Sequence, residues 1–538
     1  MAAFVGARRA SRLALGASPM AGLRPARLAL GAVRAFSSQP KTFFLETHGC
    51  QMNLADSDVV RAVLTKAGWA EATAPEGARV LLTNTCSIRE KAENKVRTRL
   101  AMWRAADRTR KLGVLGCMAS RLREELTESG MADVVAGPDS YRHLPVLLEA
   151  LDGGAAHAIH TQLSLEETYA DIAPVRSAAD GSSPVGYVTV MRGCNNMCSY
   201  CVVPFTRGRE RSRALKTIVE EVRSLVARGV REVVLLGQNV NSYWDRTTLP
   251  EDGGGGEGEV AGGGYHTAEG FGNMYKSRDG AGARFAHLLR AVAEVSPELR
   301  VRFTSPHPKD FPPEVLDVVA EVPNVCKQLH LPAQSGSSSV LASMEDHLQT
   351  LSLLKEVCFE QAFMYAYSLR SKTHASHHMQ DDVPRETKQR RLREVIDTFH
   401  AEIYAKNAAL EFGAAHVVLV EGPARKAEGM LTGRSDGNKR VVFAHTGEGP
   451  EPRVGEYAVV RVHSATGHTL RGETARDPEL QSGGVRPATL AESTALAARL
   501  TDGRHDWLAQ HSAGLAAAEA AGLTVGDDFG TGRTAAAL

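Results

Sequence analysis

Three cysteines near the middle of the chain have the spacing of ligands. Cys194, Cys198 and Cys201 stand within eight residues and follow a predicted strand and the turn residue Gly193. Three thiolates on one loop can hold three corners of a cubane iron–sulfur cluster, which leaves the fourth iron open to an exogenous ligand. The alternatives are a structural zinc site, which needs a fourth Cys or His, and inert core thiols, which rarely cluster so tightly. The spacing therefore predicts a 4Fe–4S cluster.

Three further cysteines are far apart in the sequence but share one position in the expected fold. Cys50, Cys86 and Cys117 each come just after a predicted strand. Taken singly, each is interpreted as a buried core residue, because Cys is among the most buried residue types. Successive parallel strands, however, end at the same edge of a sheet, where α/β folds place their sites. The shared position therefore favours one common site. Cys326 and Cys358 are predicted to be core residues.

The elements that must position these cysteines divide the chain into three folded parts. Residues 41–150 alternate short apolar strands with helices, which indicates a parallel α/β domain. Residues 184–405 repeat such βα units and predict a barrel or half-barrel, with strands at 186–191, 232–236, 300–304, 326–331 and 362–368. Residues 410–475 contain short β-branched runs separated by Gly and Pro, and predict a small β-barrel.

Composition and the two ends of the chain exclude several function classes. The 63 Lys and Arg nearly balance the 62 Asp and Glu among 538 residues, which excludes a globally basic nucleic-acid binder. No run approaches the ~18 apolar residues of a membrane span, so no membrane association is expected. Residues 1–38 are Arg-rich and acid-free, which is typical of a mitochondrial transit peptide, the alternative being a basic tail. Residues 476–538 predict a disordered low-complexity tail.

Several runs resemble one family of enzymes. CNNMCSYC, from Cys194 to Cys201, is similar to the signature of the radical S-adenosylmethionine (SAM) enzymes. ETHGCQMN, NTCSIREKAE and LGCMA around the other three cysteines resemble the N-terminal domain of the methylthiotransferases. LLGQNVNSY, RFTSPHPKDFPPEVL and QLHLPAQSGS resemble the branch of that family that acts on transfer RNA, and the resemblance covers about residues 42–474.

The resemblance implies cofactors and site residues. It implies an N-terminal parallel α/β domain, a partial (β/α)6 radical SAM barrel and a C-terminal TRAM barrel that binds RNA. SAM would chelate the open iron of the cluster held by Cys194, Cys198 and Cys201, with Tyr200 near the adenine. Cys50, Cys86 and Cys117 would bind a second 4Fe–4S cluster, which handles the sulfur to be inserted.

The resemblance also implies a reaction and its partners. N6-isopentenyladenosine next to the anticodon of mitochondrial tRNAs would receive a methylthio group in the mitochondrial matrix. The anticodon stem-loop presents splayed bases, and Arg207, Arg209 and Arg211 are predicted to contact its phosphates, the alternative being a solvated surface. The electron and sulfur donors are not determined by the sequence. Two competing functions are a regulatory protein that binds a kinase regulatory subunit and methylthiolation of a ribosomal protein residue.

One departure from the family pattern concerns the barrel. Met344 and Glu345 are adjacent in this chain. In the family, the stretches that match the residues before and after this join are separated by a helix, a barrel strand and a Gly-rich turn that are associated with SAM binding. The barrel is therefore expected to lack one helix–strand unit. A missing strand leaves unpaired backbone groups at the sheet edges and a gap in the cofactor wall. We expect this chain to bind SAM poorly and to be weakly active or inactive.

Overall fold

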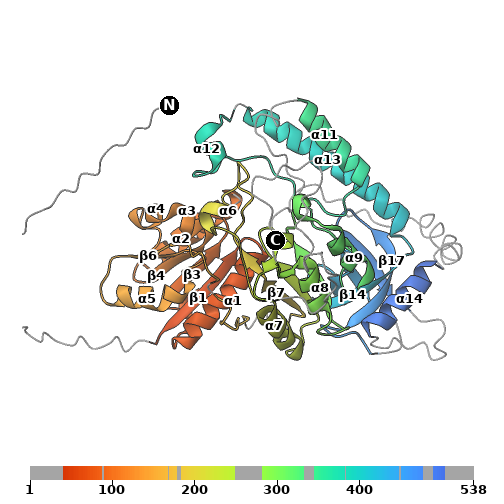
Figure 1. The fold of residues 1–538 in the computed structure, drawn as a ribbon, viewed down its shortest axis with the longest axis horizontal. Coiled ribbons are helices and arrows are strands. Elements are labelled where there is room, and N and C mark those ends of the chain that lie inside the picture. The colour runs from red at the N-terminus through yellow and green to blue at the C-terminus, as the bar shows by residue number, and fades with distance from the viewer. Residues whose placement is uncertain are drawn as a thin grey trace, which may run out of the picture. The chain divides into compact units, whose positions relative to one another are not determined.

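The computed structural model describes residues 40–87, 90–167, 169–177, 183–248, 281–331, 344–381, 383–446, 450–475 and 489–502. The predicted transit peptide at 1–38 lies outside these residues. Within the described ranges, no helix combines the length and the apolar character that crossing a membrane requires. Figure 1 shows the elements in their arrangement.

The N-terminal part is a six-stranded sheet in the order β2-β1-β3-β4-β5-β6, and every pair of neighbours is parallel. Its central strand β3 is buried along its whole length, because helices cover both faces of the sheet. The strands are β1 Thr42–His48, β2 Ala70–Glu71, β3 Val80–Thr85, β4 Lys111–Gly116, β5 Val134–Ala136 and β6 Ala158–His160. The helices are α1 Gln51–Lys66, α2 Glu90–Ala106, α3 Cys117–Leu122, α4 Glu124–Glu128 and α5 Leu144–Asp152, with single 3-10 turns at Pro75–Gly77 and Tyr141–His143.

The register of this sheet brings three strand ends together. His48 at the end of β1 pairs with Thr85 at the end of β3, and Thr85 in turn pairs with Gly116 at the end of β4. Because the three strands are parallel neighbours, the residues that follow them meet at one edge. The expectation that Cys50, Cys86 and Cys117 follow neighbouring parallel strands is confirmed.

A second parallel sheet, in the order β13-β10-β7, forms the core of the middle part. Apolar residues at helical spacing in α7, such as Ile218, Val222 and Leu225, bury one face of the helix against this sheet. The strands are β7 Val185–Thr189, β10 Glu232–Leu236 and β13 Arg300–Thr304, and the helices are α7 Leu215–Ala227, α8 Phe285–Ala293 and α9 Pro313–Glu321. Two short ribbons pair β8 Met191–Arg192 with β9 Arg211–Ser212 and β11 Trp244–Asp245 with β12 Ala283–Arg284. Single turns are α6 Val203–Thr206, Val240–Ser242 and Pro308–Asp310.

Two predicted barrel strands do not form. The strand expected at 326–331 does not form, and a single parallel bridge between Val301 and Val325 lies just before it. Residues 358–370, which include the second expected strand, contain no helix or strand. A strand is stable only when a neighbour satisfies its backbone groups, and we expect the helix–strand unit missing at the join of Met344 and Glu345 to be that neighbour. The side chain of Phe363 is consequently 60% exposed.

A helix begins at the join. Helix α11, Met344–Val357, lies beside α13, Arg385–Leu410 (Figure 1). Leu354 of α11 is buried with Phe399 and Ile403 of α13, whereas Leu348 is 60% exposed. A one-turn helix, α12 His374–His378, stands between them in the sequence.

The predicted small β-barrel is confirmed as a closed barrel in the order β14-β15-β16-β18-β17. Alternate residues of its strands, including Val418, Val460 and Phe443, fill the interior. The sequence did not predict its last strand, β18. The strands are β14 Ala415–Pro423, β15 Leu431–Arg434, β16 Arg440–Ala444, β17 Tyr457–Ala465 and β18 Thr469–Thr474.

The prediction of a disordered tail from residue 476 is wrong for helix α14, Leu490–Asp502. Leu490, Ala497 and Leu500 pack against Val417 and Tyr457 on the outside of the barrel. The Thr501 side chain adds a hydrogen bond from the Ala415 N–H at 3.1 Å. The buried face of α14 was not predicted from the sequence, because a serine and an alanine, Ser493 and Ala497, occupy two of its positions.

The exposed position of Phe363 gives a test of the open barrel. Phe363→Ser should change the free energy of unfolding by less than about 1 kcal/mol, because few contacts are lost at an exposed position. The matched variant Phe303→Ser, at a β13 residue that is 3% exposed, should cost more than about 3 kcal/mol. Urea unfolding measures both, and equal losses would show that residues 362–368 form a buried strand after all.

Candidate functional site

Cys50, Cys86 and Cys117 gather at the edge of the N-terminal sheet. Cys50 caps helix α1, Cys86 follows β3, and Cys117 is the first residue of α3. The Cys50 thiol is hydrogen-bonded to Cys86 and also lies 3.5 Å from Asn53 Oδ1. Because each residue follows a different strand, only the parallel pairing brings them together.

A buried amide pair holds this edge in shape. Asn84 Nδ2 donates to the backbone oxygen of Asn53 at 3.0 Å and to Ser57 Oγ at 3.1 Å, and Asn53 Nδ2 donates to Asn84 Oδ1 at 3.2 Å. Gly116 has a φ of 84°, and a Cβ there would collide with Asn84 Oδ1. Asn53 and Asn84 were not predicted as site residues; the available signal was their position three residues after Cys50 and two residues before Cys86.

The two kinds of thiol at this edge differ in acidity. The hydrogen bond with Cys86, helped by the charge of Arg207, lowers the pKa of Cys50 to about 6. Burial raises the pKa of Cys117. Cys50 is therefore the thiol that is ionised at neutral pH in the protein without a bound metal.

The loop from Cys194 to Cys201 leaves the β8–β9 ribbon at Gly193. Gly193 has a φ of 76°, and any Cβ there would strike the backbone of Arg209. Its N–H donates to Gln238 Oε1 at 2.5 Å. The backbone N–H groups of Asn196 and Val203 point at the sulfurs of Cys194 and Cys201, both at 3.5 Å. The loop thus holds its thiols by backbone contacts on a turn that only glycine can make.

The chemistry of these thiols fits an iron–sulfur cluster. Burial raises the pKa of Cys194 to about 12 and of Cys201 to about 11, and repulsion from the Cys198 thiol adds to both shifts. Burial also raises the pKa of Tyr200, whose side chain is hydrogen-bonded to Cys198. Such thiols ionise only when a cationic centre binds them. Among the described residues, no three His, Cys, Asp or Glu side chains lie close enough together to hold a single metal ion.

Two of the three arginines predicted to contact RNA are internal. Arg207 is 3% exposed, and its Nη2 donates to Asp56 Oδ2 at 2.7 Å; Arg211 is 7% exposed, and its Nη1 donates to Asp139 Oδ2 at 2.8 Å. The prediction is wrong for both because the N-terminal domain supplies buried carboxylates that the local sequence does not reveal. Arg209 is exposed and remains a candidate for contact with RNA.

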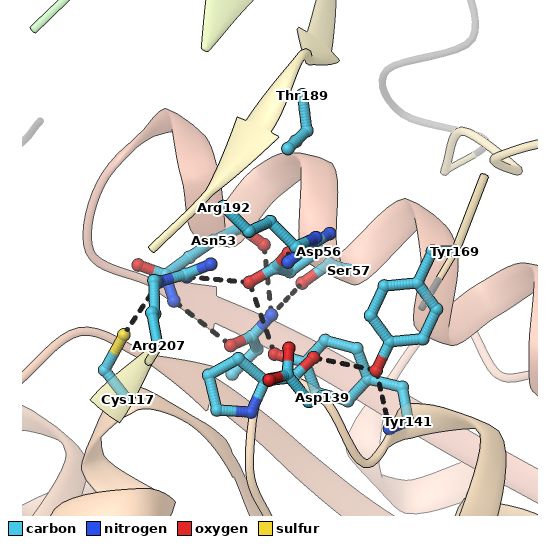
Figure 2. A network of polar contacts seen from close by, with 12 residues as sticks. Asn53, Asp56, Ser57, Cys117, Asp139, Tyr141, Tyr169, Thr189, Arg192 and Arg207 are labelled. Atoms are coloured by element: carbon cyan, nitrogen blue, oxygen red, sulfur yellow. Dashed lines mark hydrogen bonds and ion pairs between the residues drawn. The ribbon is translucent and has the colours of Figure 1, made fainter. Parts of the chain in front are cut away.

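Arg207 also joins the two groups of cysteines. It follows the loop of Cys201 in the sequence, yet its Nε donates to Cys117 Sγ at 3.2 Å (Figure 2). On the same side, Met52 and Ala55 of α1 pack against Val234 and Leu236 of β10. Helix α1, which Cys50 caps, is therefore in contact with the second sheet.

Polar residues that the sequence analysis did not single out lie beyond the strands β10 and β13. Asn241 Nδ2 donates to the carbonyls of Asp310 at 2.6 Å and His307 at 2.9 Å, and Asn239 Nδ2 donates to Asp310 Oδ2 at 2.5 Å. Burial raises the pKa of Asp310 to about 7. Lys309 Nζ reaches Asn196 Oδ1 at 2.9 Å, which ties this group to the cysteine loop. The signal that could have identified these residues is their place in two polar runs, GQNVNS and SPHPKD, each of which directly follows a strand.

The difference in acidity predicts the order in which thiols react. In the reduced, iron-free protein at pH 7, iodoacetamide should alkylate Cys50 well before Cys194 or Cys201, because the thiolate is the nucleophile. Peptide mass spectrometry over time measures the three rates. In urea the three rates should converge. Faster alkylation of Cys194 than of Cys50 in the folded protein would contradict the thiol environments described above.

Comparisons with known proteins agree with this architecture. Residues 42–137 match the family described as "Uncharacterized protein family UPF0004", residues 188–365 match the radical SAM superfamily, and residues 413–475 match the TRAM domain. The mitochondrial tRNA methylthiotransferases CDK5RAP1 of Rattus norvegicus and Homo sapiens are each 43% identical over 80% of this chain and 80% of their own length. A tRNA-2-methylthio-N(6)-dimethylallyladenosine synthase of Phocaeicola vulgatus is 39% identical, over 82% of this chain and 97% of its own. The chain therefore belongs to the radical SAM methylthiotransferase family.

Proposed function

We propose that this chain transfers a methylthio group to carbon-2 of N6-isopentenyladenosine next to the anticodon of mitochondrial tRNAs. The observation that carries the proposal is the contact between two three-thiol sites, made by Arg207 between the Cys201 loop and Cys117. The names of the relatives, which are tRNA methylthiotransferases, support the same reaction. A protein that only binds a kinase regulatory subunit is not favoured, because it would need neither thiol site.

The cofactors follow from the family and from the thiols. Membership of the radical SAM superfamily implies SAM and one 4Fe–4S cluster. We assign that cluster to Cys194, Cys198 and Cys201, and a second cluster to Cys50, Cys86 and Cys117. When bound, these groups supply the electron that cleaves the sulfonium of SAM and the sulfur to be inserted.

The chain's own residues would bind and orient the reactants. We propose that Tyr200, whose side chain is hydrogen-bonded to Cys198, faces the adenine of SAM. Asn239, Asn241 and Asp310 lie where parallel strands end, which is where α/β sheets bind ligands, and we assign them to the SAM pocket. Their mutual hydrogen bonds hold these polar groups in fixed positions.

The RNA partner is a tRNA, and we propose the anticodon stem-loop as the part that is recognised. Its single-stranded bases are the form of RNA that proteins read most easily, and chemistry on a base requires taking it out of the stack. The TRAM barrel and the exposed Arg209 are the candidate contacts on this chain. The names of the relatives place the enzyme in the mitochondrion, and we propose the matrix, where mitochondrial tRNAs are found.

The open barrel limits activity in this proposal. The segment 362–368 does not complete the sheet, so part of the expected SAM-binding wall is missing from the described structure. We expect turnover at least about tenfold below that of the human relative, which corresponds to about 1.4 kcal/mol of lost transition-state stabilisation.

Anaerobic reconstitution tests the proposal. The protein loaded with iron and sulfide should cleave SAM to 5′-deoxyadenosine and form 2-methylthio-N6-isopentenyladenosine in tRNA, measured by nucleoside mass spectrometry. Cys194→Ala, Cys198→Ala and Cys201→Ala should each reduce deoxyadenosine formation to background. Cys358→Ala is the matched control, because Cys358 lies outside both sites, and it should leave the rate unchanged.

Three results would contradict the proposal. Stoichiometric zinc in place of iron would refute the clusters. Methylthiolation of a ribosomal protein with no change in tRNA would show that the substrate is the ribosomal protein and not a tRNA. Turnover equal to that of the human relative would show that the open barrel does not impair the chain.

A further inference from the structure

A buried cluster of charges joins the N-terminal domain to the middle domain. The carboxylate of Asp56, which is 0% exposed, accepts hydrogen bonds from Arg192 Nη1 and Arg207 Nη2, both at 2.7 Å (Figure 2). The Tyr141 hydroxyl also donates to it, at 3.3 Å. One buried carboxylate is therefore shared between two guanidinium groups. Buried charges are normally paired, so the other neighbours of each guanidinium determine how its charge is balanced.

The two arginines differ in their second neighbours. Arg192 is attracted to Glu167 as well as to Asp56, so a second carboxylate partly balances its charge. The other groups that attract Arg207 are Cys117, Tyr141 and Cys50. Apart from Asp56, the charge of Arg207 therefore interacts mainly with the thiols of the N-terminal site.

Arg207 has an unused donor at the same place. Its Nη2 bonds Asp56 and its Nε bonds Cys117 Sγ at 3.2 Å, but its Nη1 has no hydrogen-bond partner among the described residues. A buried donor without a partner is rare in folded proteins. The hydrogen bond from Nε to Cys117 Sγ is therefore the contact that ties Arg207 to the thiol site.

We propose that Arg207 is a positioning residue of the N-terminal thiol site, which donates through Nε to the sulfur of Cys117 and thereby raises the reduction potential of the group bound there. Reduction of a cluster adds one negative charge, and hydrogen bonds to its sulfurs are among the factors that set its potential. A buried cation favours the more negative state. This inference rests on the second cluster of the proposed function.

Arg207 and the thiols that it faces come from different domains. Arg207 belongs to the segment that follows the Cys201 loop, while the thiols that it faces belong to the N-terminal sheet. The potential of one centre is therefore set by a residue from the domain that holds the other. Only when the two domains are docked does the N-terminal site have its cation.

The test uses the full chain with Cys194, Cys198 and Cys201 all changed to Ala, so that only the N-terminal site can hold a cluster. After anaerobic reconstitution, iron and sulfide are quantified and the cluster is titrated with dithionite while its EPR signal is recorded. Arg207→Gln should lower the reduced-to-oxidised ratio at a fixed potential at least tenfold, which is a shift of about 59 mV for one electron. Arg207→Lys, which keeps the charge, should give a smaller shift.

Arg192→Gln is the matched control. It removes a buried ion pair to the same carboxylate, but Arg192 makes no hydrogen bond to a cysteine in the described part of the chain. Its potential should shift by less than half the amount seen for Arg207→Gln. Equal shifts in both variants would overturn the assignment to Arg207.

The failures can be told apart. If the triple variant retains no iron and sulfide, the second cluster is refuted and the inference falls with it. If it retains them and Arg207→Gln has the parent's potential, only the inference is overturned. Circular dichroism checks folding, and if Arg207→Gln is unfolded, an unchanged potential and EPR spectrum in Arg207→Lys overturns the inference.

Discussion

Buried ion pairs between the carboxylate of Asp56 and two guanidinium groups join the N-terminal domain to the middle domain. Asp56 belongs to α1, whereas Arg192 and Arg207 flank the loop of Cys194, Cys198 and Cys201. Removing one partner of a buried ion pair typically costs about 3–5 kcal/mol, because it leaves an uncompensated charge. The relative position of the two thiol sites therefore depends on this one carboxylate.

Helix α1 transmits this constraint to both sheets. Val60 and Leu64 on one side lie in the core of the N-terminal sheet, and Met52 and Ala55 on the other side contact β10. Because Cys50 caps the same helix, the turn that carries the thiol cannot move without disturbing both cores. Shared packing and shared charge act on the same element.

The TRAM barrel is held by the same kind of interaction. Arg302 of β13 donates to the Ser435 carbonyl at 2.6 Å and to Glu232 at 2.9 Å, and Arg300 donates to the Val417 carbonyl at 3.2 Å. Tyr457 donates to the carbonyls of Arg231 and Glu298, which precede β10 and β13. The barrel is thus fixed near the starts of these strands, away from the ends that lead to Asn239 and Asp310. Substrate and cofactor can approach the opposite ends.

Local patterns in the sequence determined the Cys194, Cys198 and Cys201 motif, the parallel N-terminal strands and the small barrel. The shared position of Cys50, Cys86 and Cys117 after successive predicted strands indicated their common site. Spacing, helical periodicity and alternation act over a few residues, so they can be read without a fold. Only the tertiary structure decided that Arg207 and Arg211 point inward, that 362–368 stays outside the sheet and that α14 docks on the barrel. Arg207 meets Asp56 from 151 positions away, and strand 362–368 lacks the neighbour that a strand requires. A side chain's partner, and a strand's pairing, are set by what folding brings beside them, which the local sequence does not contain.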